Sequence, residues 1–332
     1  MKAIVYTSYG SPDVLRLKEV EKPEPKENEI LVRVRAASVN RTDCANLRAK
    51  PFIMRFTMGL FKPKKKIPGT EFAGDVVKVG QAVDTFKVGD KVFGFDDSVL
   101  SSYAEYLVFP ANKGIATMPR DFNYQQAGAC IEGAHYAYNF INKVELRKGQ
   151  KVLVNGASGS IGTAAVQLLK HFGADITAVC NTKNIGLVKS LGANKVVDYT
   201  KEDFTKDSEK YDYVFDCVGK STFGKCRPLL KPRGVYISSE LGPWSQNIFY
   251  SLISAIFGRI PGMEGKKVKF PYPPNIRRSV LLVKNLIEEG KFKSVIDRSY
   301  PLEKVADAFR YVEKGQKTGN VSITIGGDQE SK

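Results

Sequence analysis

The sequence predicts an α/β protein with two domains, an antiparallel β-barrel and a doubly wound parallel sheet. Three observations support this prediction. The chain has 332 residues, which is more than a single hydrophobic core usually accommodates, so two domains are expected. Its first part has the pattern of successive strands with no long helical pattern between them. From about residue 123 onward, strand and helix patterns alternate, as they do in a parallel sheet covered by helices on both faces.

The first part of the chain contains short apolar or alternating runs that predict strands. Turn-forming Gly, Pro and Asp residues separate these runs. The runs are AIVYTSYG, EILVRVRAASV, EFAGDVVKVG, DKVFGF and AEYLVFP. Strands that follow one another without crossover helices pair antiparallel, and such a sheet avoids exposed edges by closing on itself. We therefore expect a barrel-like domain here rather than a parallel sheet.

The second part begins with a helical stretch, YQQAGACIEGAHYAYNFI, and continues in strand–helix pairs. The predicted strands are KVLVNG, DITAVC, KVVDY, YDYVFDCVG and GVYISS, and the predicted helices include IGTAAVQLLKHFG, NIGLVKSLG and FGKCRPLL. Parallel strands need such crossover helices. Near the end, SVLLVKNLIEEGKF has the apolar spacing of another helix, and NVSITIG has that of a final strand.

Composition narrows the class of protein. The five cysteines, Cys44, Cys130, Cys180, Cys217 and Cys226, form no CxxC pair and are expected to be reduced thiols. The N-terminal MKAIVYTSYG resembles a strand and turn rather than a signal peptide. No run approaches the roughly 18 apolar residues of a membrane-spanning helix. We therefore expect a soluble, cytoplasmic protein.

The net charge of +16 raises the question of an anionic partner. No helix-turn-helix, zinc-finger or RNP-type pattern directs this charge into a nucleic-acid groove, so we expect no nucleic-acid partner. The charge is uneven, because Leu47–Gly69 contains seven Lys or Arg residues, no acid, and several Phe, Met, Ile and Leu side chains. This mixture fits either a solvated loop packed on its own domain or contact with an anionic membrane or substrate.

A second segment, Asn247–Phe270, has an apolar stretch of helical length followed by Arg259, Lys266, Lys267 and Lys269. Two interpretations of it stay open: packing between the subunits of a dimer, and peripheral contact with an anionic membrane. In the second case both segments would lie on one face, where their cations would attract anionic lipid.

The stretch VLVNGASGSIG predicts a strand, a tight turn and a helix whose first amides face an anion. Gly156, Gly159 and Gly162 form the turn and let the backbone approach a pyrophosphate closely. Glycines alone are weak evidence, but their place between a strand pattern and a helix pattern predicts a dinucleotide site. The amides expected to point at the pyrophosphate are those of Ser158, Gly159, Ser160 and Ile161.

The end of the next predicted strand, DITAVC, distinguishes between the two nicotinamide cofactors. NAD sites usually have an acid here that accepts hydrogen bonds from the ribose hydroxyls. In this chain Cys180 is followed by Asn181, Thr182 and Lys183. Thr182 and Lys183 offer a hydroxyl and a cation to a 2′-phosphate, so NADPH is expected. The alternative is that Lys183 only caps an exposed turn.

Five blocks of sequence follow one another between residues 28 and 200, within a similarity that runs along essentially the whole chain. They are NEILVRVRAASVNRTD, PGTEFAGDVVKVGQAVDTFKVGDKVFGF, SSYAEYLVFP, VLVNGASGSIGTAAVQLLKHFGADITAVC and LGANKVVDYT. Together they resemble the medium-chain dehydrogenase/reductases, and in particular the zinc-free, NADPH-dependent quinone oxidoreductase and 2-alkenal reductase branch. The resemblance implies a GroES-like β-barrel catalytic domain, residues 1–122 and 295–332, with a Rossmann nucleotide-binding domain, residues 123–294, inserted in it. It also implies a homodimer.

The zinc enzymes of this superfamily hold their catalytic metal with a Cys, a His and a later Cys. At the first two positions this chain has Asn40 in NRTD and Thr70 in GTE, and only Cys130 lies near the third. One thiolate is too few for Zn²⁺, which takes about three protein ligands in catalytic sites. His135 and His171 lie in predicted helices, where packing or surface roles are expected. We therefore expect a metal-free protein.

The resemblance also assigns candidate site residues. Asn40 matches a position whose polar side chain contacts the nicotinamide or the acceptor oxygen. Thr42 matches the proton-relay hydroxyl of the zinc enzymes, a role that depends on zinc there, and Asp43 is expected to be a buried acid that fixes this loop. Further positions expected beside the cofactor are Tyr199, near the adenosine 2′-phosphate, Gly219, Thr318, Gly319 and Asn320. For these the alternative is ordinary turn or strand chemistry.

Removing the proton of an alcohol needs a Lewis acid or a good base, and the sequence indicates neither. Hydride transfer from NADPH to a quinone or an α,β-unsaturated carbonyl needs only a dry site that holds donor and acceptor face to face. We expect this zinc-independent oxidoreductase activity. Two alternatives stay open: reduction of an enoyl thioester, with the basic segment facing acyl-CoA phosphates, and a nucleotide-binding adaptor or membrane-surface protein with little turnover.

Overall fold

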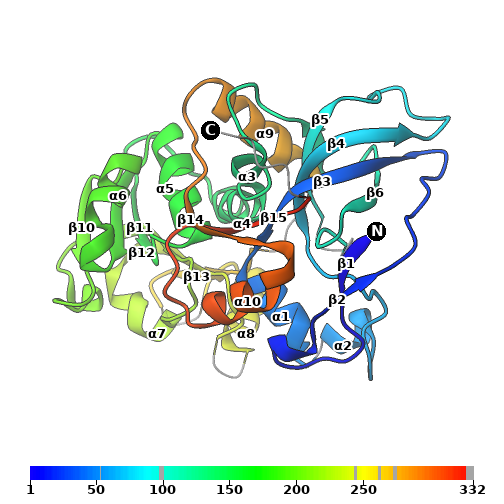
Figure 1. Ribbon diagram of the computed structural model, residues 1–332. Helices are drawn as coiled ribbons and strands as arrows, with labels where there is room; N and C mark the ends of the chain where they lie inside the picture. Colours follow the sequence, from blue (N-terminus) through cyan, green and yellow to red (C-terminus); the bar gives the residue numbers. More distant parts are fainter. Residues whose placement is uncertain (53, 97–100, 243–244, 261–262, 272–274, 327–332) are drawn as a thin grey trace. The chain divides into compact units, whose positions relative to one another are not determined.

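The computed structural model describes residues 1–52, 54–96, 101–242, 245–260, 263–271 and 275–326 (Figure 1). The chain divides into two compact units. The first unit combines Met1–Glu132 with Asn275–Lys332, and the second is the intervening stretch Gly133–Pro274. The first unit contains a mainly antiparallel sheet and the second a parallel sheet, so both predicted fold types are confirmed.

The first unit is built on a seven-stranded sheet. Its strands are β3 (Glu29–Val39), β4 (Glu71–Val79), β5 (Lys91–Phe95), β6 (Tyr106–Pro110), β7 (Ile115–Thr117), β14 (Ile296–Pro301) and β15 (Asn320–Thr324). Their order is β14-β15-β3-β4-β5-β7, and β6 also pairs with β3. Because β15 pairs antiparallel with β3, the C-terminal part of the chain completes the sheet, as the resemblance implies. A separate two-stranded sheet joins β1 (Lys2–Val5) and β2 (Arg16–Glu19).

Large apolar side chains fill the core of the first unit. Val32 and Val34 of β3 are buried, two residues apart on one face of the strand. Phe72 from β4 and Phe109 from β6 meet with their ring centroids 5.0 Å apart. Helix α10 (Val305–Glu313) closes the core with Phe309, which is fully buried. Burial of each such side chain stabilises the fold by about 1.5–3 kcal/mol.

The boundaries of the units differ from the expected ones, which place residues 123–294 in the parallel-sheet domain. Helix α3 (Tyr124–Ala127) packs on β3 and β4, and α9 (Ile276–Glu288) packs on β5 and β7. Lys284 of α9 donates a 2.6 Å hydrogen bond to Thr117 of β7. Both helices therefore belong to the first unit. Their sequences are helical, and helical pattern alone does not reveal which sheet a helix covers.

The second unit is a six-stranded parallel sheet in the order β10-β9-β8-β11-β12-β13. Its strands are β8 (Lys151–Asn155), β9 (Asp175–Cys180), β10 (Lys195–Asp198), β11 (Tyr211–Asp216), β12 (Leu230–Ser238) and β13 (Lys267–Lys269). Its helices are α5 (Ser160–His171), α6 (Ile185–Leu191), α7 (Phe223–Cys226) and α8 (Gln246–Phe257). The strand order reverses between β8 and β11, and ligands of such sheets bind at the carboxyl ends of the strands beside this point.

The remaining helices are short or join the two units in sequence. Helix α4 (Ile131–Asn142) begins at the end of the first unit, and α1 (Arg41–Arg48) and α2 (Met54–Met58) follow β3. The 3₁₀ turns are Pro12–Val14, Thr182–Asn184, Phe204–Lys206, Arg227–Leu229 and Leu302–Lys304. Among the described residues, no helix has the length and hydropathy needed to cross a membrane.

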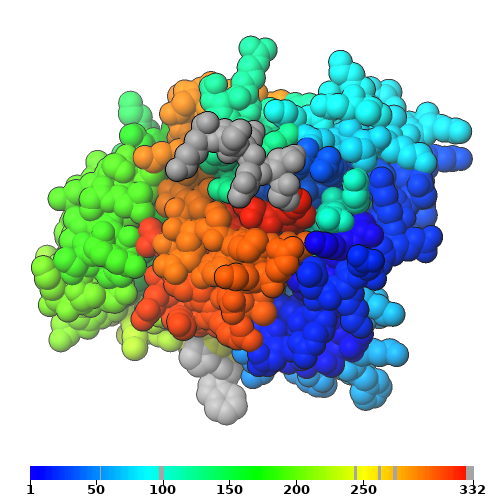
Figure 2. Space-filling view, viewed as in Figure 1, coloured from blue at the N-terminus to red at the C-terminus, as the bar shows by residue number. Residues whose placement is uncertain are grey.

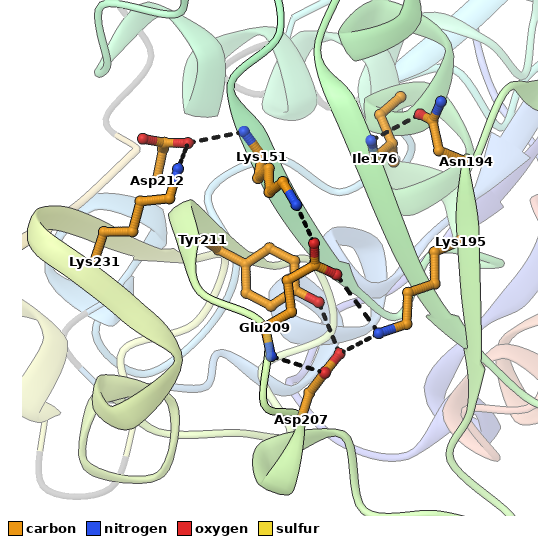
Figure 3. A network of polar contacts seen from close by, with 9 residues as sticks. All are labelled: Lys151, Ile176, Asn194, Lys195, Asp207, Glu209, Tyr211, Asp212 and Lys231. Atoms are coloured by element: carbon orange, nitrogen blue, oxygen red, sulfur yellow. Dashed lines mark hydrogen bonds and ion pairs between the residues drawn. The ribbon is translucent and has the colours of Figure 1, made fainter.

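A network of charged side chains ties together the amino ends of the strands in the second unit (Figure 3). Lys195, at the start of β10, pairs with Asp207 at 2.7 Å, and this hydrogen bond raises the pKa of Lys195. Lys151, at the start of β8, pairs with Glu209, and its amide donates to Asp212 at 2.8 Å. At the amino edge of the sheet these charged side chains are thus paired with one another. The candidate ligand site lies at the opposite, carboxyl edge of the same sheet.

Candidate functional site

The glycine turn of the second unit connects the end of β8 to the start of α5. Gly156 has a φ of +76°, and a Cβ there would lie 2.7 Å from Val218 Cβ. A Cβ on Gly162 would lie 2.1 Å from the carbonyl oxygen of Gly156. At Gly159 the φ is −80°, and the nearest atom to a Cβ would be 3.6 Å away. Gly156 and Gly162 are therefore required by the fold, whereas Gly159 leaves open space beside the helix terminus.

This open space fits a phosphate. The amides of the first turn of a helix have no intrahelical partner, and the helix dipole favours an anion there. One predicted contact changes, because the Gly159 N–H donates to the Gly156 carbonyl at 3.1 Å and closes the turn. The amides of Ser158 and Ile161 make no hydrogen bond to any described residue, and these two are the better candidates to hold a pyrophosphate.

A buried carboxylate shapes the loop after β11, beside the reversal of strand order. Asp216 accepts hydrogen bonds from Asn155 Nδ2 at 2.9 Å and from the amides of Gly219 and Ser221 at 3.1 Å each. Gly219 has a φ of +64°, and a Cβ there would lie 2.0 Å from Glu240 Cγ. The fold thus requires glycine at position 219 whether or not a cofactor contacts it.

The expected 2′-phosphate site contains an acid that the sequence analysis did not place there. The Thr182 hydroxyl donates to Asp198 Oδ2 at 2.5 Å, from the end of the neighbouring strand β10. Asp198 also accepts from Thr200, and the Thr182 hydrogen bond lowers the pKa of Asp198. The Thr182 hydroxyl proton is therefore committed to a carboxylate. Lys183 is exposed and forms no ion pair with any described residue, and the Tyr199 ring is 55% exposed.

In the first unit, Asn40 lies at the centre of a buried polar network. Only 3% of Asn40 is exposed. Its Nδ2 donates to Ser38 Oγ at 3.1 Å and to Glu132 Oε2 at 3.1 Å, and its Oδ1 accepts from Lys317 Nζ at 3.3 Å. Both amide protons of Asn40 are committed within the protein. A hydrogen bond from Asn40 to an acceptor oxygen would therefore require one of these contacts to break.

Glu71 belongs to this network and has no exposed surface. Its Oε1 accepts from the amides of Cys130 at 2.8 Å, Ile131 and Glu132 at 3.3 Å, where α4 begins. Its Oε2 accepts from the Ser38 hydroxyl at 2.6 Å. Burial, and next the neighbouring Glu132 carboxylate, raises the pKa of Glu71 to about 8. The hydrogen bonds that favour the charged form do not offset the loss of water.

Asp43 is buried, as expected, and fixes the start of α1. Its Oδ2 accepts a hydrogen bond from the backbone N–H of Asn40 at 2.8 Å, in a capping box at the helix start. Burial, and next the Glu132 carboxylate, raises the pKa of Asp43 well above its usual value. Thr42, on the same turn, is half-buried, and its hydroxyl makes no hydrogen bond to a described residue. Asp43 thus stabilises the start of α1, whereas no described contact gives Thr42 a comparable structural role.

Lys317 provides the cation of this network. Its ammonium donates to Asn40 Oδ1 and to the carbonyl of Gly319, so two of its three N–H groups have partners among the described residues. Burial lowers the pKa of Lys317 to about 8, although the carboxylates of Glu132 and Asp297 act in the opposite direction. Gly319 has a φ of +63°, and a Cβ there would lie 2.2 Å from the Val295 carbonyl oxygen.

The positions that hold zinc in related enzymes have donor groups that do not suit it. Asn40 offers an amide already used in hydrogen bonds, and the Cys130 thiol donates to the Ala127 carbonyl. Burial raises the pKa of Cys130 well above its usual value, which disfavours the thiolate. His135 is buried in α4 beside Asn139 and burial lowers its pKa to about 4. Within the described ranges no group of three or more His, Cys, Asp and Glu could hold a metal.

Comparison with known proteins agrees with this fold. Residues 26–120 match the family described as alcohol dehydrogenase GroES-like domain, and residues 191–322 match that described as zinc-binding dehydrogenase. The chain is 34% identical over 341 residues to the 2-methylene-furan-3-one reductase of Solanum lycopersicum, covering 97% of this chain and 79% of that protein. The chain belongs to the medium-chain dehydrogenase/reductases. Within them it falls in the quinone and alkenal oxidoreductase branch.

Two further relatives of this medium-chain dehydrogenase/reductase extend the comparison. The NADPH-dependent alkenal/one oxidoreductase, chloroplastic, of Arabidopsis thaliana is 32% identical over 342 residues, covering 97% of this chain and 79% of that protein. The quinone oxidoreductase structure from Coxiella burnetii superposes with a TM-score of 0.85 at 25% identity, covering 98% of this chain and 99% of that one. The GroES-like and Rossmann assignments are thereby confirmed. Among the residues that the structure describes, no set of donor groups fits the zinc named in the second family's description.

Three members of this network were not identified from the sequence: the buried Glu71 and Glu132 and the half-buried Lys317. Glu71 and Lys317 adjoin the candidate residues Thr70 and Thr318, and Glu132 lies two residues after Cys130. An acid or lysine in such a position gives no signal of burial by itself, because most such side chains are exposed. The available signal was that Glu71 directly follows Thr70, which stands at a zinc-ligand position of the related enzymes.

Proposed function

We propose that this oxidoreductase transfers hydride from NADPH to a quinone or an α,β-unsaturated carbonyl compound without a metal. The names of its relatives support this reaction and this cofactor. The observation in this chain that supports it best is the Asn40 network. A metal-binding position is occupied by an amide held in place by Ser38, Glu132 and Lys317.

The second unit would hold the cofactor. The amides of Ser158 and Ile161 and the space at Gly159 fit the pyrophosphate. Lys183 supplies a cation for the 2′-phosphate, and the exposed Tyr199 ring offers an apolar face to the adenine. When bound, NADPH supplies the hydride. Asp198 holds Thr182 and Thr200 in place, and its charge makes Lys183 the main determinant of selectivity for the phosphate.

The first unit would supply the proton. When hydride adds to the β-carbon of an enone, the electron pair of the double bond moves to the carbonyl oxygen and gives an enolate. The Lys317 ammonium, whose pKa is lowered to about 8 by burial, is a suitable acid for this oxygen or the adjacent carbon. Lys317 gives up one proton, becomes a neutral amine and recovers a proton from water. Asn40 Oδ1 orients the Lys317 side chain, because it accepts a hydrogen bond from the ammonium and would also accept one from the neutral amine.

Turnover assays separate this proposal from its alternatives. NADPH oxidation is followed at 340 nm with 1,4-benzoquinone, 2-alkenals and crotonyl-CoA as separate acceptors. The proposal predicts consumption of NADPH with the quinone or the 2-alkenals. Faster turnover with crotonyl-CoA than with either would instead favour an enoyl-thioester reductase. Tight NADPH binding without turnover of any acceptor would favour a nucleotide-binding adaptor.

The cellular setting belongs to the same proposal. We propose a cytoplasmic homodimer, on the family resemblance and on an exposed apolar face of α8. On that helix Phe249 is 61%, Leu252 57% and Ile256 73% exposed, and a subunit interface would cover such a face. Light scattering coupled to size-exclusion chromatography measures the oligomeric state. A mass near 36.8 kDa, that of one chain, would contradict the dimer.

A further inference from the structure

We propose that the basic aromatic segment of the first unit, residues 52–66, docks on anionic phospholipid membranes. The segment includes α2 and the turns after it, and all of it except residue 53 is described. Part of it is visible on the surface of the first unit in light blue (Figure 2). The inference concerns this segment alone and does not depend on the reaction that the protein catalyses.

The segment exposes large apolar side chains close together. Phe52 is 61%, Phe56 67%, Leu60 41% and Phe61 87% exposed. The rings of Phe52 and Phe56 touch edge to face, with centroids 6.1 Å apart, and together form an apolar surface rather than isolated residues. Elsewhere in the first unit, the exposed large apolar residues described are Leu17, Val88 and Leu281. A clustered apolar surface of this kind indicates an interaction site.

The same segment has positive charge that no acid neutralises. Its cations are Arg55, Lys62, Lys64, Lys65 and Lys66. None of them forms an ion pair with a described residue, whereas nearby Arg48 pairs with Glu313 at 2.6 Å. The Arg55 guanidinium instead lies over the rings of Tyr9 and Phe52, 5.1 and 5.5 Å from their centroids. Cations beside exposed aromatic rings complement a surface that is anionic outside and apolar below, which is the surface of an anionic membrane.

Hydrogen bonds hold the segment in a defined conformation. The Tyr9 hydroxyl donates to the Gly59 carbonyl at 2.8 Å, and the Lys64 amide donates to the Met58 carbonyl at 2.8 Å. Gly59 has a φ of +124°, and a Cβ there would lie 2.1 Å from the Lys62 carbonyl oxygen, so the turn needs glycine. The exposed rings therefore project from a fixed turn. Docking would not have to order this part of the chain, which favours binding.

The expected strength follows from the charges. Each Lys or Arg near an anionic surface contributes about 1 kcal/mol, or about a fivefold change in affinity. Neutralising two lysines in Lys64→Ala/Lys65→Ala should thus weaken binding about 30-fold. Removing two rings in Phe56→Ser/Phe61→Ser should weaken it at least tenfold, because these rings would no longer enter the lipid interface. High salt should release the protein, since exposed charges are screened.

Co-sedimentation of the full chain with vesicles tests this surface. We expect binding to vesicles of 70% phosphatidylcholine and 30% phosphatidylserine in 50 mM NaCl, but not to pure phosphatidylcholine or in 500 mM NaCl. The charge control is Lys189→Ala/Lys206→Ala, which removes two exposed, unpaired lysines of the second unit. The apolar control is Leu17→Ser/Val88→Ser. Both controls should bind as the original protein does, and circular dichroism shows that each variant is folded.

Four results would overturn the proposal. The first is absence of binding to the anionic vesicles at low salt. The second is equal loss of binding in the segment variants and in their controls. This result would indicate that the net positive charge of the protein, and not this segment, causes the binding. The third is loss of binding on changing α8, in Phe249→Ser/Ile256→Ser, with none on changing the segment. The fourth is binding to an anionic DNA duplex that Phe56→Ser/Phe61→Ser does not weaken, because a lipid-specific surface needs these rings.

Discussion

Glu71→Gln tests whether the buried carboxyl group of Glu71, at the start of α4, lowers the free energy of unfolding when it is charged. Moving a Glu pKa from its usual 4.5 to about 8 corresponds to about 5 kcal/mol, at about 1.4 kcal/mol per tenfold change in proton affinity. Between pH 4.5 and 8 the native state keeps a proton that the unfolded state releases. The free energy of unfolding therefore falls as the pH rises through this range, and the loss is complete above pH 8.

Glutamine keeps the oxygen that accepts from the α4 amides and has no charge to bury. The free energy of unfolding of Glu71→Gln minus that of the original protein should thus increase by at least about 2 kcal/mol from pH 5 to pH 9, with about 5 kcal/mol as the limit. Urea unfolding followed by circular dichroism at each pH measures it. Glu303→Gln, at an exposed position of the same unit, is the control and should show no such trend. A difference that does not change with pH would show that burial does not raise the pKa of Glu71.

Three further predictions concern the reaction. Activity with an enone should decline as the pH rises above about 8, where Lys317 loses its proton, and Lys317→Met should lower kcat at least tenfold and remove this dependence. Competitive acetylation of Lys317, read by mass spectrometry, should independently give its pKa near 8; a value near 10.4 would contradict the assignment. Lys183→Ala should weaken NADPH binding by about 1.5–3 kcal/mol and leave NADH nearly unchanged, whereas equal losses would show that Lys183 does not contact the phosphate. Activity should survive prolonged chelation, and a stoichiometric, activity-linked metal would overturn the site.

The fold could be predicted from sequence because its signals are local. Alternating runs identify β3 and β4, and the glycine spacing between β8 and α5 identifies the turn of the parallel sheet. The boundaries between the units could not be predicted, because α3 and α9 have helical sequences that would suit either sheet. Which sheet each helix covers depends on contacts between residues far apart in the chain, such as Lys284 with Thr117.

The contacts of the candidate site residues could not be predicted, for a similar reason. Asn40 and Gly159 were named from motifs, but the sequence does not reveal what their atoms contact. The Gly159 amide closes its own turn, and the protons of the Asn40 amide are held by Ser38 and Glu132. Asp198 reaches Thr182 from a neighbouring strand, and Lys317 reaches Asn40 from the other end of the chain. Such pairings arise from strand order and burial.

The central claim is that hydride passes from the nicotinamide to carbon of the acceptor without a metal. It is tested most directly with NADPH deuterated at C4, prepared as the 4R and 4S forms, and a 2-alkenal acceptor in the presence of a chelator. Mass spectrometry and NMR of the product locate the deuterium. Direct hydride transfer predicts one deuterium at the β-carbon from one of the two forms, and a proton from water at the α-carbon. Product without deuterium from either form, or no product until a metal is restored, would contradict it.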